Sequence, residues 1–203
     1  MIETQKTSKT RALLVNVARD LFAQKGKQNI TMNDIAIASG KGRRTLYTYF
    51  SNKNEVYLAV IENELDILIE RLQEVMERNL SPIKKLEAYF FTRFEVIKEA
   101  VTRNGSLKSD FFRNIYEVEK ARRPIDVKEI RMIKQIISAG VADGSFSIES
   151  PQWAAMLILY AMKGIEAPYL SPNIGNNIRD RRPQIMNFLM NGMLKKKEIG
   201  VRN

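Results

Sequence analysis

The sequence predicts an all-α fold, and three observations lead to that prediction. Apolar residues recur at three- and four-residue intervals through almost the whole chain, as they do on one face of a helix. Stretches rich in glycine, proline, serine and asparagine divide this pattern into helix-sized lengths. The only strand-like run is short, at residues 145–148. The chain has 203 residues, of which 44% are hydrophobic, so it can bury a sizeable core.

The first predicted helix follows the polar cluster at residues 7–10 and ends at Gly26, which suits a left-handed C-terminal cap. Its apolar positions follow the spacing 0, 3, 4, 7 and 8, which defines one face of a 3.6-residue period. These positions are Leu14, Val17, Ala18, Leu21 and Phe22.

A second helix is predicted to open at Thr31, with Asp34 three residues later forming a shortened capping box, and to end at Gly40. A short third segment follows at residues 43–50, where Leu46 and Phe50 share a face. The second and third segments, joined by a tight glycine turn, have the outline of a helix-turn-helix.

The rest of the chain also reads as helices. Asn52 and Glu55 repeat the cap pattern and start a long helix that closes at residues 79–82. Breaks at residues 103–106, 122–124, 143–151 and 168–177 separate the remaining apolar stretches. These stretches predict helices at about residues 83–103, 107–120, 125–142, 151–166 and 178–197.

Composition narrows the function. The chain has no cysteine and no histidine, which removes thiolate and imidazole metal sites and every Ser-His or Cys-His mechanism. We therefore expect no metal, no cofactor and no enzymatic activity. No stretch approaches 18 consecutive apolar residues, and the N-terminal residues lack the apolar centre of a secretion signal. No membrane association is expected, and the cytoplasm is the expected location.

The positive charge is concentrated near the start of the chain. Residues 1–53 hold ten Lys and Arg against three Asp and Glu, a net charge of +7 out of the chain's +10. Such a concentration favours a surface that meets a polyanion, although a solvated basic face without a partner is the alternative. Arg43 and Arg44 sharpen the question, because cations at a helix N-terminus cost about 0.3–1 kcal/mol each when nothing offsets them. A bound anion would offset them.

Residues 11–56 resemble the N-terminal DNA-binding domain of the TetR family of bacterial transcriptional regulators. The similarity rests on the first helix, on the second helix with its turn, and on the string TLYTYF at residues 45–50. The matching residues outside that string are Leu14, Ala18, Leu21, Phe22, Gly26, Ile30, Thr31, Met32, Ile35, Ala36, Gly40, Lys53 and Glu55. The resemblance implies a helix-turn-helix domain at residues 8–68, with the helix-turn-helix itself at about 31–50, and an effector-binding and dimerisation domain at residues 69–203.

The same resemblance, together with the charge argument, selects the residues that would contact double-stranded DNA. Arginines in the first turn of a recognition helix can pair with guanine or clamp phosphate. The predicted DNA-binding residues are Thr31, Arg43, Arg44, Thr45, Tyr47, Tyr49 and Lys53. Family members often have an apolar residue at position 41, serine or threonine at 42 and glycine at 44. This chain has Lys41, Gly42 and Arg44 there, so base-by-base readout cannot be carried over.

Seven of the 17 aromatic residues lie between Tyr89 and Tyr116. Resemblance to the family implies a pocket for a small, often apolar, effector in this region, whereas a plain packed core is the alternative reading of aromatic residues at helical spacing. The candidate pocket residues are Phe90, Phe94, Phe111, Phe112, Tyr116 and Tyr160.

The last two predicted helices are expected to form a homodimer interface, with burial inside one subunit as the alternative. Small residues seven apart would let helices approach closely, and an apolar stripe would complement them. The candidate interface residues are Ala154, Leu157, Ala161, Gly164, Ile185, Phe188 and Leu189.

These features together predict a homodimeric, ligand-responsive transcriptional regulator, expected to be a repressor that a small molecule releases from its DNA operator. Two rival functions belong to other classes. One is a helical protein-interaction adaptor without specific DNA binding, and the other is a helical enzyme that uses carboxylates. The effector and the operator sequence are unknown from the sequence.

Overall fold

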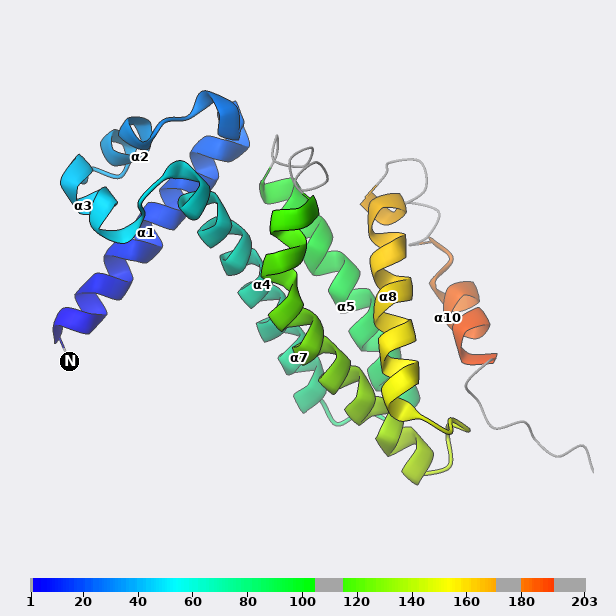
Figure 1. Cartoon of the computed structure of the whole chain (residues 1–203). Coiled ribbons are helices and arrows are strands. Elements are labelled where there is room, and N and C mark those ends of the chain that lie inside the picture. The colour runs from blue at the N-terminus through cyan, green and yellow to red at the C-terminus, as the bar shows by residue number, and fades with distance from the viewer. Residues whose placement is uncertain (1, 105–114, 171–179, 192–203) are drawn as a thin grey trace, which may run out of the picture. The chain divides into compact units, whose positions relative to one another are not determined.

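The computed structural model describes residues 2–104, 115–170 and 180–191, and nearly all of them are helical (Figure 1). This confirms the predicted all-α class. No strand occurs among these residues, and the run at 145–148 is a turn with a single bridge residue. The elements are α1 (Ile2–Lys25), the 3-10 helix η1 (Lys27–Asn29), α2 (Met32–Ala38), α3 (Arg43–Tyr49), α4 (Lys53–Glu77), α5 (Pro82–Arg103), α7 (Ile115–Ala142), α8 (Pro151–Leu170) and α10 (Arg182–Asn191).

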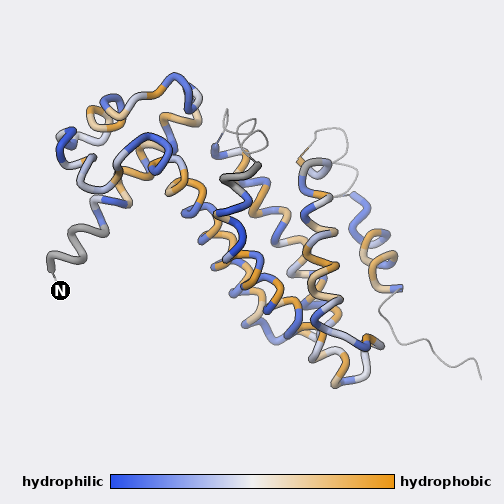
Figure 2. Tube along the Cα trace, viewed as in Figure 1, coloured by the Kyte–Doolittle hydropathy of each residue, from blue (hydrophilic) through white to orange (hydrophobic). Residues whose placement is uncertain are grey.

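The chain divides into two compact units. The N-terminal unit contains residues 1–68 together with 98–125, and the C-terminal unit contains residues 69–97 together with 126–203. The helices α4, α5 and α7 therefore each contribute to both units. Along α4, hydrophobic and hydrophilic residues alternate turn by turn, as expected of a helix with one buried face (Figure 2). The division into domains at residues 8–68 and 69–203 stays a prediction.

Seven predicted apolar residues lie in the core of the helix-turn-helix region, whereas Val17 and Leu21 of the predicted face of α1 are half-buried. Each of the seven is at most 3% exposed, and each comes from α1, α2, α3 or the residue that follows α3. They are Leu14, Ala18, Phe22, Ile35, Ala36, Leu46 and Phe50. The predicted cap of α4 is also present, because the Glu55 amide donates to Asn52 Oδ1 at 3.0 Å and the Ser51 amide donates to Glu55 Oε2 at 2.8 Å.

The first helix is longer than predicted, because α1 begins at Ile2 instead of after Thr10. No proline or glycine lies before Leu14, so nothing stops a nucleated helix from extending toward the N-terminus. At its other end Gly26 has a φ of 78°, as predicted, but its ψ of 146° differs from that of a left-handed helical cap.

Two prolines that were predicted to end or precede helices lie inside them. Pro124 lies within α7, although the sequence predicted a break at residues 122–124, and Pro168 lies within α8. In both helices, buried residues follow the proline. Ile125 and Glu129 follow Pro124, and Tyr169 follows Pro168. This burial offsets the hydrogen bond that each proline removes. The predicted start of the helix at residue 107 lies outside the described residues.

In the C-terminal unit, α5 packs against α7 and α8 around a buried arginine. The Arg93 side chain is 0% exposed, and its guanidinium lies 2.7 Å from Glu129 on α7 and 2.7 Å from Glu166 on α8. Burial alone would lower the pKa of Arg93, but the two carboxylates raise it above its ordinary value. Burial and the charge of Glu129 raise the pKa of Tyr89, whose hydroxyl lies 3.4 Å from Glu129. In the described part of the chain, no helix is long and apolar enough to cross a membrane.

Candidate nucleic-acid interface

The turn between α2 and α3 depends on a glycine. Gly40 follows the C-cap Ser39 and has a φ of 63°, a conformation that a side chain at this position would strain. The Gly40 amide donates to Ile37 O at 3.1 Å, and the Lys41 amide donates to Ala36 O at 3.1 Å. These two hydrogen bonds form a Schellman motif, which ends α2. The next helix, α3, then starts three residues after Gly40.

The N-terminus of α2 carries a complete capping box, as the sequence predicted. Thr31 Oγ1 accepts a hydrogen bond from the Asp34 amide at 3.2 Å, and Asp34 Oδ2 accepts one from the Thr31 amide at 2.8 Å. Hydrogen bonds from the Thr31 hydroxyl and amide lower the pKa of Asp34. The predicted DNA contact of Thr31 would therefore have to share its hydroxyl and amide with Asp34.

The first turn of α3 presents two arginines to solvent. Gly42 is the N-cap and offers no side-chain acceptor, and the first turn contains no acidic residue. Arg43 and Arg44 are exposed. Neither forms an ion pair with any residue that the structure describes. The positive end of the helix dipole and two uncompensated cations thus coincide at one exposed point, which is suited to binding a polyanion.

The other predicted contacts on α3 differ in exposure. Tyr47 is 45% exposed, whereas Thr45 and Tyr49 are half-buried. Leu46 and Phe50, on the opposite face, are buried and hold α3 against the core. The helix therefore has one packed face and one open face, and Arg43, Arg44 and Tyr47 lie on the open one.

Lys53 has protein partners that the sequence did not predict. Its ammonium donates to Lys27 O at 2.8 Å and to Gln28 O at 3.3 Å, so it holds η1 against the first turn of α4. Lys27 itself is 8% exposed, and its ammonium donates to Asn54 Oδ1 at 2.7 Å and lies 3.9 Å from the centre of the Tyr57 ring. Sequence reasoning missed this link, because contacts between residues 26 positions apart leave no local pattern.

The predicted effector-pocket residues are spread over different environments. Phe90 and Phe94 are at most 4% exposed and pack edge to face, with ring centres 4.9 Å apart. Tyr160 is 55% exposed on α8. Phe111 and Phe112 lie outside the described residues, as does the side chain of Tyr116. Of the three candidates whose side chains the structure describes, it brings Phe90 and Phe94 together and leaves Tyr160 on the surface.

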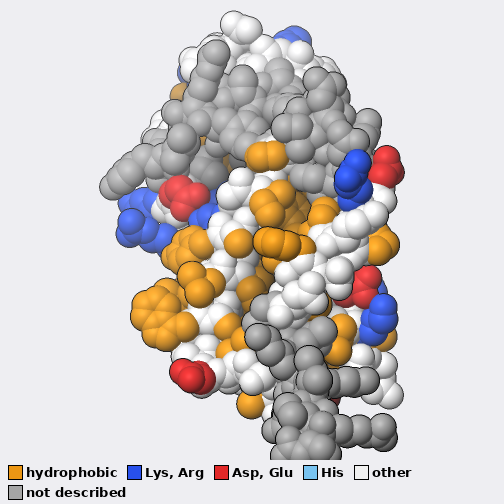
Figure 3. Space-filling view, turned by 90° about the vertical axis from the view of Figure 1, so that its right-hand side faces the viewer, with side chains coloured by type: hydrophobic (Ala, Val, Ile, Leu, Met, Phe, Trp, Pro, Cys, Tyr) orange, Lys and Arg blue, Asp and Glu red, His pale blue; other side chains and the backbone are white. Residues whose placement is uncertain are grey.

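The predicted interface residues lie on an exposed apolar face of α8 and α10. Leu157 is 66% and Phe188 81% exposed, and Ala161 and Gly164 are also exposed. Ala154, Ile185 and Leu189 are half-buried. The periodicity missed Trp153, which is 64% exposed one turn before Leu157. Figure 3 shows hydrophobic side chains gathered on this face, with charged side chains toward its edges.

The sequence and the fold of this chain are similar to those of known regulatory proteins. The family described as bacterial regulatory proteins, tetR family, matches residues 14–60. The HTH-type transcriptional repressor KstR2 of Mycolicibacterium smegmatis is 29% identical over 144 residues, which cover 66% of this chain and 65% of that protein. The match thus spans just under two thirds of that relative's length. KstR2 of Rhodococcus jostii is 24% identical over 195 residues, 94% of each chain.

A transcriptional regulator from Cytophaga hutchinsonii has a similar structure, with a TM-score of 0.75 over 91% of this chain and 98% of that one, at 21% identity. This likeness supports the fold. The sequence match, by contrast, covers α2, the glycine turn, α3 and the start of α4, where the capping box, the Schellman turn and the exposed arginines lie. Residues 14–60, which hold the helix-turn-helix, thus match the tetR family of bacterial regulatory proteins.

Proposed function

We propose that this protein is a transcriptional repressor that binds a double-stranded DNA operator and releases it when a small molecule binds to its C-terminal part. The observation that carries the proposal is the pair of exposed arginines in the first turn of α3, which have no carboxylate partner among the residues that the structure describes. The matches to proteins named transcriptional repressors support repression, as opposed to activation, of transcription. The proposal assigns no catalytic role and places the protein in the cytoplasm with its DNA.

In this proposal α3 lies in the major groove, and its first turn faces the base edges. Arg44 stands where relatives often have glycine, so we assign it to a base, and Arg43 to phosphate. A bidentate contact with guanine would discriminate at one base pair, whereas a phosphate contact would only position the protein. Tyr47 would contact the DNA backbone from the same open face. Lys53 would reach phosphate only by giving up its bonds to the carbonyl groups of η1.

The DNA-binding test starts from genomic fragments that the full-length protein selects from its own organism. Binding of one labelled fragment is then measured over a series of salt concentrations for the wild type, Arg43→Ala and Arg44→Ala. Arg131→Ala is the matched control, because this substitution removes the same charge from an exposed position on α7, outside the helix-turn-helix. A base contact should cost about 1–3 kcal/mol and relax specificity at one position, and a phosphate contact should reduce the salt slope by about one. Wild-type affinity and salt slope in both variants would refute the interface.

We further propose that the exposed apolar face of α8 and α10 joins two copies of the chain. A single seven-residue recognition helix covers too few base pairs for specificity, and a dimer would place two such helices about 34–36 Å apart. Phe188→Asp should yield a 23.4 kDa monomer in sedimentation at micromolar concentration. Val127→Asp is the control, since Val127 is 57% exposed on α7, a helix that contributes none of the predicted interface residues. A wild-type protein that sediments only as a monomer would contradict the proposal.

Effector control requires two states with unequal affinity for the small molecule. The helix α4 begins beside the helix-turn-helix and continues into the C-terminal unit, so it is the element through which we propose that the effector acts. Effector binding would change the position of α4 and with it the separation of the two recognition helices in the dimer. An effector that leaves operator affinity unchanged at saturation would contradict this mechanism.

A further inference from the structure

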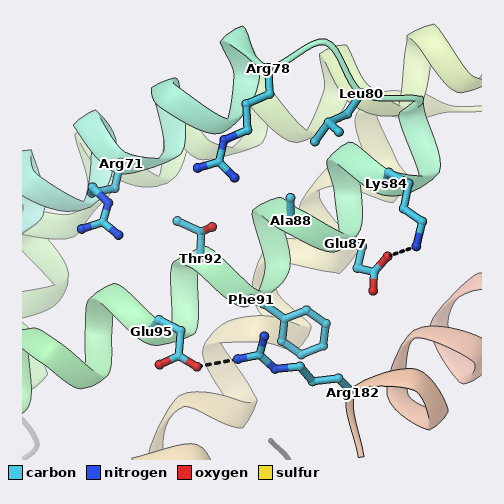
Figure 4. Close-up of a pocket in the computed structure, with 10 residues that line it drawn as sticks. All are labelled: Arg71, Arg78, Leu80, Lys84, Glu87, Ala88, Phe91, Thr92, Glu95 and Arg182. Atoms are coloured by element: carbon cyan, nitrogen blue, oxygen red, sulfur yellow. Dashed lines mark hydrogen bonds and ion pairs between the residues drawn. The ribbon is translucent and has the colours of Figure 1, made fainter.

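The C-terminal unit has a groove between the last turns of α4, the middle of α5 and the start of α10 (Figure 4). Its volume is about 430 Å³, within the range of about 300–1,000 Å³ that is typical of small-molecule sites. Leu80 and Phe91 form apolar parts of its wall, and Phe91 is 6% exposed. The groove is open to solvent along one side, so an occupant would keep part of its surface in water.

Cations dominate the charge around this groove. Four cationic side chains, those of Arg71, Arg78, Lys84 and Arg182, line it together with two carboxylates, which leaves an excess of two positive charges. Figure 4 shows Arg71 on α4, and Arg78 just after the end of α4, both extending toward α5. Lys84 is paired with Glu87 at 2.8 Å, and Arg71 lies 3.7 Å from Glu74. Arg78 forms no ion pair with any described residue.

Arg182 connects this groove to α10. Its guanidinium donates to Glu95 Oε1 at 2.7 Å and lies 4.6 Å from the centre of the Phe91 ring, so it bridges α10 to α5. The same Glu95 oxygen accepts a hydrogen bond from the Tyr169 hydroxyl on α8 at 3.0 Å. An anion in the groove would compete with Glu95 for Arg182 and would thereby loosen the start of α10.

We propose that this groove binds an amphipathic carboxylate, whose head pairs with Arg78 and whose hydrocarbon body lies against Phe91 and Leu80. The fork of an arginine side chain matches the two oxygens of a carboxylate, and the excess positive charge excludes cationic amphiphiles. This inference rests on the proposed function, because it makes the groove the effector site. The carboxylate acts on α10, which carries Phe188 of the proposed dimer face.

Calorimetry on the full-length protein without DNA tests the binding step, with decanoate as the probe. Decanoate should bind once per chain, and Arg78→Gln should weaken it about tenfold or more, as expected for loss of a charge-assisted pair. Arg131→Gln, exposed on α7 outside the groove, should bind as the wild type does. Decyltrimethylammonium, which has the same chain and the opposite charge, should not bind. Equal decanoate affinity in Arg78→Gln and the wild type, or equal binding of the two amphiphiles, would overturn the site.

A second measurement tests the effector role, using the genomic fragment selected above. Decanoate should release the wild-type protein from this fragment, and Arg78→Gln should require about tenfold more of it. If decanoate binds but does not release the protein from the DNA fragment, the effector role is overturned, whereas the proposed carboxylate site is not. A protein that binds no fragment even without decanoate would instead contradict the proposed function, so the two failures are distinguishable.

Discussion

Replacing Arg93 by methionine should severely destabilise the C-terminal unit. Arg93→Met keeps a long side chain but removes the only cation within 2.7 Å of Glu129 and Glu166 among the described residues. Removing one partner of a buried ion pair costs about 3–5 kcal/mol, because the remaining charge is left buried without compensation. Two carboxylates lose the cation that they share here, so we expect the upper end of that range. Total stabilities of about 5–15 kcal/mol leave little margin for such a loss.

The matched control lies on the same helix. Lys84 pairs with Glu87 at 2.8 Å, almost the same distance, but its side chain is 67% exposed. Lys84→Met should therefore cost less than about 1 kcal/mol. The difference between the two variants isolates burial, because the helix, the charge removed and the pairing distance are closely matched.

The assay is urea unfolding followed by circular dichroism at one fixed protein concentration, since a dimer's stability depends on concentration. Arg93→Met combined with Glu129→Gln and Glu166→Gln should recover much of the loss and shows the effect even where the single variant does not fold. A deficit for Arg93→Met no larger than that for Lys84→Met would refute the reasoning.

Three further predictions concern local structure. Gly140→Ala should destabilise the protein by about 1–3 kcal/mol in urea unfolding, because the new Cβ would overlap the buried Phe146 ring. An unchanged free energy of unfolding would mean that the ring moves freely. Thr31→Ala should cost about 1 kcal/mol in the same assay through loss of the α2 cap, while Asn33→Ala, exposed on the same helix, should not. The pKa of Asp34 is lower in the folded protein than its unfolded value near 3.8, so the ionised carboxylate stabilises the fold. This contribution to the free energy of unfolding is present above pH 3.8 and is lost as the pH falls through the folded pKa. Asp34→Asn should flatten that part of the stability-pH curve, and an unaltered curve would contradict this.

Features set by neighbouring residues could be predicted from the sequence. Thr31 with Asp34 and Asn52 with Glu55 form caps over three residues, and Gly40 ends α2 by its own backbone freedom. Most of the buried residues of α1 to α3 follow from the helical period, although Val15 is buried outside the predicted face. These signals lie within one or two turns of chain, so a linear reading contains all the information they need.

Features set by distant residues could not be predicted in this way. Pro124 was read as a helix break, because its local cost is visible in the sequence while the burial of Glu129 beyond it is not. The family resemblance assigned Lys53 to DNA, but its ammonium donates to two carbonyl groups of its own chain. These carbonyl groups lie 25 and 26 residues away, so no local pattern indicates them. The groove lined by Arg78 and Arg182 joins residues about a hundred positions apart, and no spacing rule could bring them together.

The arginines show how the fold turns composition into function. By composition they are equivalent contributors to a net charge of +10. In the structure Arg93 has two carboxylate partners and is buried, and Arg182 has one at the edge of a groove. Arg43, Arg44 and Arg78 have none among the described residues and are exposed. A cation already neutralised inside the protein gains little from an external anion, whereas an exposed unpaired one gains the full interaction. Unpaired charge is therefore available at the first turn of α3 and in the groove beside α4. At these places we propose that the two anions, DNA and an amphipathic carboxylate, bind.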